Sequence, residues 1–121
     1  MSSARPNDII IVDDEPDLVR SLARLLRASG YQVRSATSGE EALSLVRQSS
    51  PGAIIMDIMM PGMNGVEAYR QVKSQLPHLP VIFMTGYSEM EQAALHEGGS
   101  AVLRKPIALD DLLAELGKLN L

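Results

Sequence analysis

Three aspartates follow two of the most apolar runs of the chain, where their carboxylates could bind a metal ion. Asp13 and Asp14 come directly after residues 9–12, and Asp57 comes directly after residues 53–56. Carboxylates gathered at one place repel one another unless a cation lies between them, and oxygen ligands favour a hard divalent ion that keeps part of its water shell. A carboxylate at position 57 could also attack phosphorus, provided that a metal ion and an ammonium offset its charge.

Polar groups also follow the fourth and fifth apolar runs. Thr85 offers a hydroxyl donor to a phosphate oxygen, and Gly86 leaves room beside it. The Lys105 ammonium and one Mg²⁺ would together balance the three aspartates, so that the site could then accept a phosphoryl dianion. Lys105–Pro106 is one of the few peptide bonds that could be cis, a geometry that would aim the ammonium inward. Each signal alone has an ordinary structural explanation, and their coincidence at four strand ends is the specific observation.

The elements that must position these groups alternate along the chain. Segments with helical spacing lie between the apolar runs, and they begin near residues 16, 38, 64, 88 and 109. In the first of them, Leu18, Leu22 and Leu25 are expected to face inward, and Gly30 to end the helix. The alternation predicts an α/β fold with a doubly wound, parallel five-stranded sheet, whose strand carboxyl ends share one edge. The expected strands are residues 9–12, 31–34, 53–56, 81–84 and 100–103.

Composition restricts the class of protein. The chain has 121 residues, of which 45% are hydrophobic and 21% are charged, with a formal net charge of −4 and no cysteine. Disulfides and cysteine-ligated zinc are therefore excluded, and the charge argues against binding of nucleic acid by this domain. No apolar run is long enough for a membrane helix, and residues 1–7 lack a signal peptide. We expect a cytoplasmic protein with a single domain over residues 1–121, a core over about 8–119, and a flexible N-terminus over 1–7.

Taken together, the motifs resemble those of the receiver domain of two-component response regulators. The similarity runs from about residue 8 to residue 119. The motifs that carry it are Asp13-Asp14, Asp57-Ile58-Met59-Met60-Pro61-Gly62, Met84-Thr85-Gly86 and Lys105-Pro106. The resemblance implies a (βα)5 flavodoxin-like three-layer sandwich with strand order 2-1-3-4-5.

The resemblance also implies a role for each acid. Asp57 would be the phosphorylation site, accepting a phosphoryl group from the phosphohistidine of a sensor histidine kinase or a phosphotransfer protein. Asp14, Asp57 and the backbone carbonyl of Met59 would bind Mg²⁺ directly, and Asp13 would act through a metal-bound water. Mn²⁺ could substitute for Mg²⁺. Such a protein is a signalling domain that promotes its own phosphorylation and dephosphorylation, rather than an enzyme with turnover.

Further implications concern the switch. Lys105 would pair with the phosphate, and Thr85 would hydrogen-bond to it and move. Receivers usually carry Tyr or Phe three residues before this lysine, where the present chain has Val102. Ring rotation is therefore not available here, and a backbone shift is the expected signal. Phosphorylation would alter the surface of the last two helices and the strand between them, and so change a partner or a homodimer.

Other positions are candidates by analogy with the family. Met59 and Tyr87 border the phosphoryl group in receivers, and their bulk is expected to shield the acyl phosphate from water. The first helix and the loop after the last strand dock the kinase, which makes candidates of Asp17, Leu18, Ser21 and Ile107. Arg20, Arg24 and Arg27 recur at helical spacing and are interpreted as a solvated helix face.

Three alternatives remain open from the sequence. A degenerate receiver would act as a docking module independent of phosphorylation. A phosphatase with an aspartyl nucleophile would require a second acidic residue two positions after the nucleophile, and this position is Met59. A carrier of FMN would need a loop rich in glycine and hydroxyl groups where residues 13–15 are acidic. The cognate kinase, the pathway and any output domain are not readable, since a single-domain regulator, a longer regulator and a hybrid kinase share this pattern.

Overall fold

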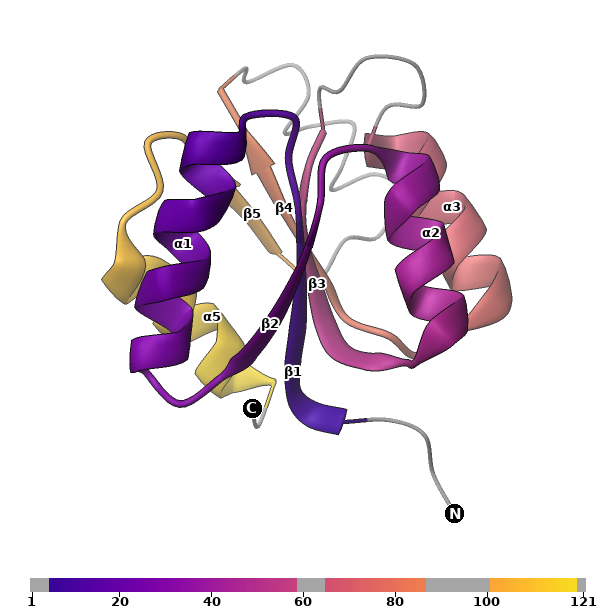
Figure 1. The fold of residues 1–121 in the computed structure, drawn as a ribbon, viewed down its shortest axis with the longest axis horizontal. Coiled ribbons are helices and arrows are strands. Elements are labelled where there is room, and N and C mark those ends of the chain that lie inside the picture. The colour runs from indigo at the N-terminus through magenta and orange to yellow at the C-terminus, as the bar shows by residue number, and fades with distance from the viewer. Residues whose placement is uncertain (1–4, 59–64, 87–100, 120–121) are drawn as a thin grey trace.

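The computed structural model describes residues 5–58, 65–86 and 101–119, which form a parallel five-stranded sheet with helices on both faces (Figure 1). The strand order is β2-β1-β3-β4-β5. The predicted α/β class and strand order are therefore confirmed. The predicted helix over residues 88–98 lies outside the described residues. The elements are β1 (Arg5–Val12), α1 (Pro16–Ala28), β2 (Gln32–Ala36), α2 (Gly39–Gln48), β3 (Pro51–Asp57), α3 (Gly65–Gln75), β4 (Val81–Thr85), β5 (Ala101–Arg104) and α5 (Leu109–Lys118).

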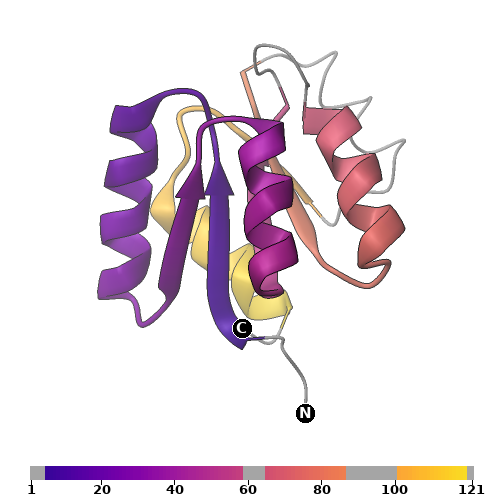
Figure 2. The same cartoon turned by 45° about the vertical axis from the view of Figure 1, so that its right-hand side comes forward.

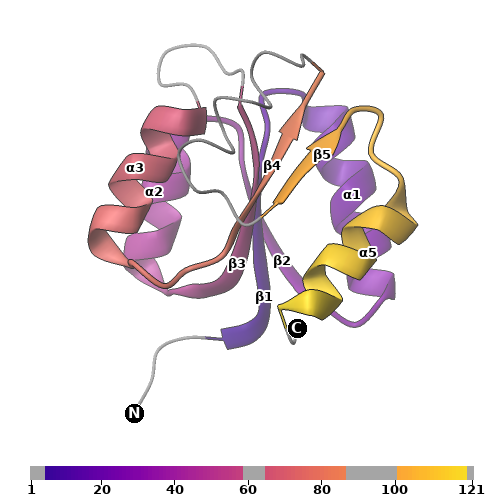
Figure 3. The ribbon, with the colours of Figure 1, turned by 180° about the vertical axis from the view of Figure 1, so that it is seen from behind.

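The sheet separates two apolar cores. Helices α1 and α5 cover one face and α2 and α3 the other, as Figures 1 and 3 show from opposite sides. Because side chains alternate along a strand, Ile9 and Ile11 of β1 pack under α1 and α5, while Ile10 and Val12 pack under α2 and α3. Both sets are fully buried. This double burial explains why the central strands are apolar at every position.

The carboxyl ends of the strands define the edge that matters for function. All four strand pairs are parallel, so the five strands end at the same edge of the sheet. Figure 2 shows the arrowheads of β1 and β2 at this edge, with the C-terminal end of α5 at the opposite one. Among the described residues, no helix has the length and apolar character needed to cross a membrane.

Local hydrogen bonds explain where the helices begin and end. The Ser38 side chain caps α2 by accepting a hydrogen bond from the Glu41 backbone N–H at 3.1 Å. The Glu41 carboxylate accepts in return from the Thr37 backbone N–H at 2.7 Å, one residue before the position expected for a capping box. After α1, Gly30 adopts a φ of +101°, as a helix-ending residue in the left-handed region does.

Two details differ from the sequence-based expectations. Strand β1 begins at Arg5, so residues 5–7 belong to the sheet although a flexible N-terminus was expected over 1–7; residues 1–4 lie outside the described part. Leu25, expected to face inward, is 42% exposed. The buried stripe of α1 consists of Val19, Leu22, Ala23 and Leu26, which leaves Leu25 on its flank.

Candidate functional site

The three aspartates meet at the carboxyl edge of the sheet. Asp13 follows the last residue of β1, and Asp57 is the last residue of β3. These strands are neighbours with Val12 opposite Met56, so the residues that follow this pair lie beside each other. One carboxylate oxygen from each of Asp13, Asp14 and Asp57 lies within 4.8 Å of the others. Asp13 and Asp57 are buried, whereas Asp14 is exposed.

The backbone around Asp13 fixes its carboxylate. Its N–H donates to the Ala36 carbonyl at 3.1 Å, which continues the pairing of β1 with β2. Its Oδ1 accepts a hydrogen bond from the Glu15 N–H at 3.0 Å. Its Oδ2 lies 2.8 Å from Lys105 Nζ, yet no described donor is oriented to hydrogen-bond to this buried oxygen. The Lys105 ammonium therefore offsets the charge of the Asp13 carboxylate, while Oδ2 stays without a hydrogen-bond donor among the described residues.

Lys105 supplies the positive charge of the site. Its ammonium lies 2.8 Å from Asp13 Oδ2, 3.1 Å from Asp57 Oδ2 and 3.3 Å from Glu15 Oε1. Burial alone would lower the pKa of Lys105, but the nearby negative charges of Asp13 and Asp57 outweigh it and raise the pKa above its ordinary value. The ammonium is thus held in its charged form beside Asp57.

Pairing between β4 and β5 brings Lys105 and Thr85 to the same place. The Lys105 N–H donates to the Thr85 carbonyl at 2.8 Å, and the Lys105–Pro106 peptide bond is cis. Thr85 is fully buried at the end of β4, directly after the residue paired with Asp57. Gly86 is exposed, and a Cβ placed there would meet nothing within 4 Å, so there is open space beside Thr85.

The donor set fits a hard divalent cation such as Mg²⁺. All three candidate ligand atoms are carboxylate oxygens, and the Lys105 ammonium pairs with Asp13, Asp57 and Glu15 among the described residues. The buried Asp13 Oδ2, which lacks a hydrogen-bond donor among the described residues, is further reason to expect a cation here. Oxygen ligands without nitrogen or sulfur favour Mg²⁺, Mn²⁺ or Ca²⁺ over softer metals.

Comparison with known proteins decides the family. The sequence matches the family model described as the response regulator receiver domain over residues 9–117. The chain belongs to this family. It is accordingly the receiver domain of a two-component response regulator, a class of signalling domain.

Similar proteins agree with this assignment. Response regulator MprA of Mycolicibacterium vanbaalenii is 38% identical over 113 residues, which cover 92% of this chain and 49% of that protein. MprA of Mycobacterium bovis is 37% identical over 110 residues, or 89% of this chain and 48% of that protein. The chain therefore spans about half the length of the curated relatives it matches.

Solved structures are similar over nearly the whole domain. A receiver domain protein from Clostridium thermocellum has a TM-score of 0.87 and 30% identity, covering 93% of this chain and 92% of that one. A CheY-like receiver domain protein from Methanospirillum hungatei has a TM-score of 0.88 and 29% identity, covering 96% and 95% of the two chains. The similarity thus extends to the arrangement of all the described elements.

The remaining candidate positions of the receiver domain lie around this centre or outside the described residues. Met59 and Tyr87 fall outside the described residues. Val102 is half-buried and packs against the core beneath α2 and α3. Pro106 is exposed beside the site.

The positions expected to contact a kinase lie near one another on the α1 and α5 side of the receiver domain. Asp17 and Ser21 are exposed on α1. Leu18 and Ile107 are half-buried and pack against the same apolar core, although α1 and the loop after β5 are far apart in sequence.

Glu15 is a member of the site that sequence reasoning did not assign. Its carboxylate is a third acidic neighbour of Lys105, at 3.3 Å, and its side chain is 64% exposed. The signal was the run of three acids at 13–15, but a run alone does not tell which side chains turn toward the strand ends. The structure resolves this because Glu15 is the N-cap of α1 and its N–H is held by Asp13.

Proposed function

We propose that this receiver domain accepts a phosphoryl group on Asp57 from the phosphohistidine of a sensor histidine kinase or a phosphotransfer protein. The observation that supports it is the position of Lys105 Nζ, 3.1 Å from Asp57 Oδ2, beside two further aspartates at the same strand edge. Mg²⁺ is the proposed cofactor, with Mn²⁺ as a substitute.

In the proposed reaction, an Asp57 carboxylate oxygen attacks phosphorus and forms a P–O bond. The P–N bond of the phosphohistidine breaks, and the departing imidazole keeps the electron pair and takes a proton. Lys105 shifts its hydrogen bond toward a phosphoryl oxygen, and the Thr85 hydroxyl donates to another. Catalysis then consists of positioning and charge neutralisation by preorganised groups.

Four groups of the chain would hold the divalent cation. Asp14, Asp57 and the backbone carbonyl of Met59 would bind it directly, and Asp13 would bind it through water. When bound, the cation neutralises the negative charge that the acids and the incoming phosphoryl group bring together. Without such a charge, the dianion would approach a cluster whose carboxylates outnumber its single ammonium.

In the proposed switch, phosphorylation is signalled by a shift of the backbone rather than by rotation of an aromatic ring. Val102 is packed into the core beneath α2 and α3, and its short side chain has no polar group with which to report a movement of Thr85. The Lys105 N–H bond to the Thr85 carbonyl links a displacement of β4 directly to β5. The surface of β5, α5 and residues 88–98 would then bind a partner or a second copy of the chain.

Recognition of the kinase is proposed at the start of α1 and the loop after β5. Leu18 and Ile107 contribute to one apolar core there, while Asp17 and Ser21 are exposed beside them. A helical phosphotransfer partner could contact these four positions and still present its phosphohistidine to the strand edge.

Phosphorylation by a small donor tests the proposal. The purified protein is incubated with Mg²⁺ and acetyl phosphate, and its intact mass is measured with and without EDTA. We expect one phosphoryl group on the wild type and on Asp110→Asn, an exposed acid of α5, and none on Asp57→Ala or in EDTA. An unmodified wild type would contradict the proposal and favour a docking module, and phosphate release over many turnovers would favour a phosphatase.

The lifetime of the phosphorylated form tests the proposed shield. If Met59 and Tyr87 exclude water, the Met59→Asn, Tyr87→Glu double variant loses its phosphoryl group faster than the wild type. Phosphate release after removal of donor measures this rate, and equal rates would show that these side chains do not protect the acyl phosphate.

A further inference from the structure

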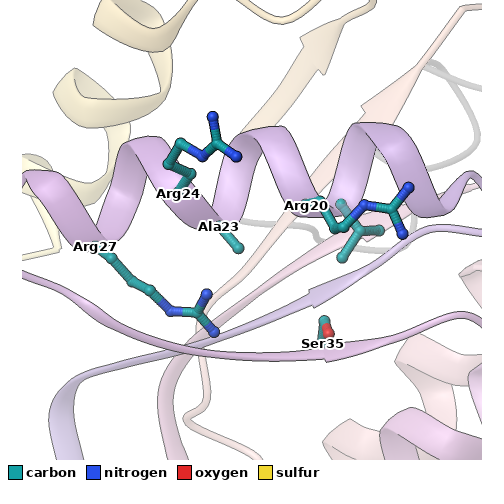
Figure 4. Close-up of a pocket in the computed structure, with 6 residues that line it drawn as sticks. Arg20, Ala23, Arg24, Arg27 and Ser35 are labelled. Atoms are coloured by element: carbon teal, nitrogen blue, oxygen red, sulfur yellow. The ribbon is translucent and has the colours of Figure 1, made fainter.

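A groove between α1 and the edge strand β2 gathers positive charge away from the aspartate cluster. Its volume is about 330 Å³, and six residues line it (Figure 4). None of the six is acidic. They are Val19, Arg20, Ala23, Arg24, Arg27 and Ser35.

Three guanidinium groups recur at helical spacing on α1, although the net charge of the chain is −4. Arg20 and Arg24 are four residues apart on α1, an arrangement in which like charges destabilise a helix. Asp17 pairs with Arg20 and offsets part of this repulsion. The remaining positive charge favours an anion as the occupant.

The arginines differ in how far the fold already uses them. Arg27 donates to the Val33 carbonyl of β2 at 2.9 Å, so its guanidinium is held across the groove. Figure 4 shows this side chain extending from α1 to β2 and the Arg24 side chain directed away from the strand. Arg24 makes no hydrogen bond or ion pair with any described residue, so its five N–H donors are free to turn toward a ligand.

The floor and the wall of the groove add two further properties. Val19 and Ala23 are 4% exposed and form an apolar floor. Ser35 of β2 is exposed and adds a hydroxyl on the opposite wall. An apolar floor with a few polar groups and a volume near the lower end of about 300–1,000 Å³ is typical of small-molecule sites.

We infer that the groove between α1 and β2 binds a small phosphate-bearing molecule of nucleotide size. Guanidinium forks match phosphate oxygens in pairs, and Arg20 and Arg27 stand two helical turns apart, about 10 Å. That span exceeds a single phosphate group and leaves space for an organic portion over the apolar floor. The inference is independent of phosphorylation at Asp57, because no residue of the acid cluster lines the groove.

Calorimetric titration with ADP, pyrophosphate and adenosine tests the inference, in EDTA so that the aspartate cluster holds no cation. We expect saturable binding of ADP and pyrophosphate. Tighter binding of ADP than of pyrophosphate would support an organic portion over the apolar floor, and equal binding of the two would contradict it. Amide NMR shifts at Val19 and Ser35 on titration would locate the ligand in the groove.

Charge variants make the test specific. Arg24→Gln removes no structural contact, and we expect it to weaken ADP binding at least about tenfold, the loss of a charge-assisted hydrogen bond. Arg47→Gln, an exposed arginine of α2, is the matched control and should leave binding unchanged. Circular dichroism checks that both variants fold.

Three results would overturn the inference. They are absence of saturable binding of ADP and pyrophosphate, equal losses in Arg24→Gln and Arg47→Gln, and shifts confined to residues outside the groove.

Discussion

Lys105 illustrates how opposing effects are balanced at the scale of a single residue. Only 21% of its side chain is exposed, and removal of its ammonium from water disfavours the charge. Asp13 and Asp57 lie within 3.1 Å and contribute more in the opposite direction, so the pKa of Lys105 is raised. The site therefore keeps its one positive side chain throughout the neutral range.

The raised pKa of Lys105 predicts how stability depends on pH. A group whose pKa is raised by folding contributes its full stability below its unfolded pKa, about 10.4 for lysine, and loses it as the pH rises through the folded value. We expect the difference in unfolding free energy between the wild type and Lys105→Met to stay constant from about pH 7 to about pH 9 and to shrink above about pH 10.4. Urea denaturation in EDTA measures it.

The matched control for that prediction is Lys118→Met. Lys118 pairs with Glu115 on the surface of α5, where 74% of its side chain is exposed. Its substitution should change stability by less than about 1 kcal/mol at any of these pH values. A Lys105 difference that already declines between about pH 7 and about pH 9 would contradict the balance described for this site.

Burial separates the roles of the two acids that flank Asp14. Asp13 is fully buried within the cluster of candidate ligands, whereas the Glu15 side chain is 64% exposed and its carboxylate pairs with Lys105. We expect Asp13→Asn to weaken Mg²⁺ binding by about 10–100-fold, as loss of a water-mediated or supporting ligand does. Glu15→Gln should weaken it by less than about threefold. Calorimetric titration with MgCl₂ compares them, and equal losses would show that Glu15 is part of the metal site.

Strand ends predict which residues meet, but not how their side chains turn. The apolar runs before Asp13, Asp57, Thr85 and Lys105 were sufficient to place all four at one edge, because parallel strands end together. The contact of Glu15 with Lys105 was not predictable, since it depends on the turn between β1 and α1. Direct ligation by Asp14 and Met59 stays a prediction.

Arg34 is a connector at the scale of the secondary-structure elements. From β2 it donates to Asp8 of β1 at 2.6 Å and to the carbonyls of Leu45 and Ser49, at 3.0 and 2.7 Å. Ser49 is the C-cap of α2, so the guanidinium satisfies the carbonyl of the helix-ending residue and adds a second donor to the Leu45 carbonyl, which also accepts the Ser49 N–H. One side chain thereby joins two strands and a helix on the face opposite α1.

Removal of Arg34 should destabilise the fold without changing the proposed phosphorylation site. Asp8 is 3% exposed, and a buried carboxylate that loses its partner costs about 3 kcal/mol or more. We expect Arg34→Met to lower the unfolding free energy by about 3 kcal/mol and the Asp8→Leu, Arg34→Met pair to recover part of this loss. Urea denaturation measures both, and acetyl phosphate should still label the folded protein. A loss below about 1 kcal/mol would show that water replaces the guanidinium.

Periodicity located α1 but misjudged one flank of its apolar stripe. Leu18, Leu22 and Leu25 recur at helical spacing, yet the described core takes Val19 and Ala23 as well and leaves Leu25 exposed. Residues 19, 22, 23 and 26 form a buried stripe that is only as wide as the contact of α1 with the sheet. Which residues at the border of this stripe are buried depends on how α1 is rotated about its own axis. The spacing of apolar residues in the sequence does not predict this rotation.

At the scale of the whole molecule, the charged residues at the carboxyl edge of the sheet are held by strands whose other residues form the apolar core. Residues of β1, β3 and β4 are buried on both faces of the sheet, and Asp13, Asp57 and Thr85 lie at the carboxyl ends of these strands. The sheet holds the carboxylates of Asp13 and Asp57 close together despite their mutual repulsion. We therefore expect the stability of the domain to be coupled to cation binding at this cluster.

This coupling predicts opposite effects of one substitution with and without metal. In EDTA, Asp57→Asn should be more stable than the wild type, because it removes one of the clustered negative charges while Lys105 keeps Asp13 at 2.8 Å. At a Mg²⁺ concentration a hundred times its Kd, the wild type should gain about 2.7 kcal/mol in unfolding free energy by mass action, and the variant should gain far less. Urea denaturation in EDTA and in MgCl₂ gives the four values, with Asp110→Asn as the exposed acid that should follow the wild type. If Asp57→Asn is the less stable protein in EDTA and gains as much from Mg²⁺, then the aspartates neither repel one another nor share the cation.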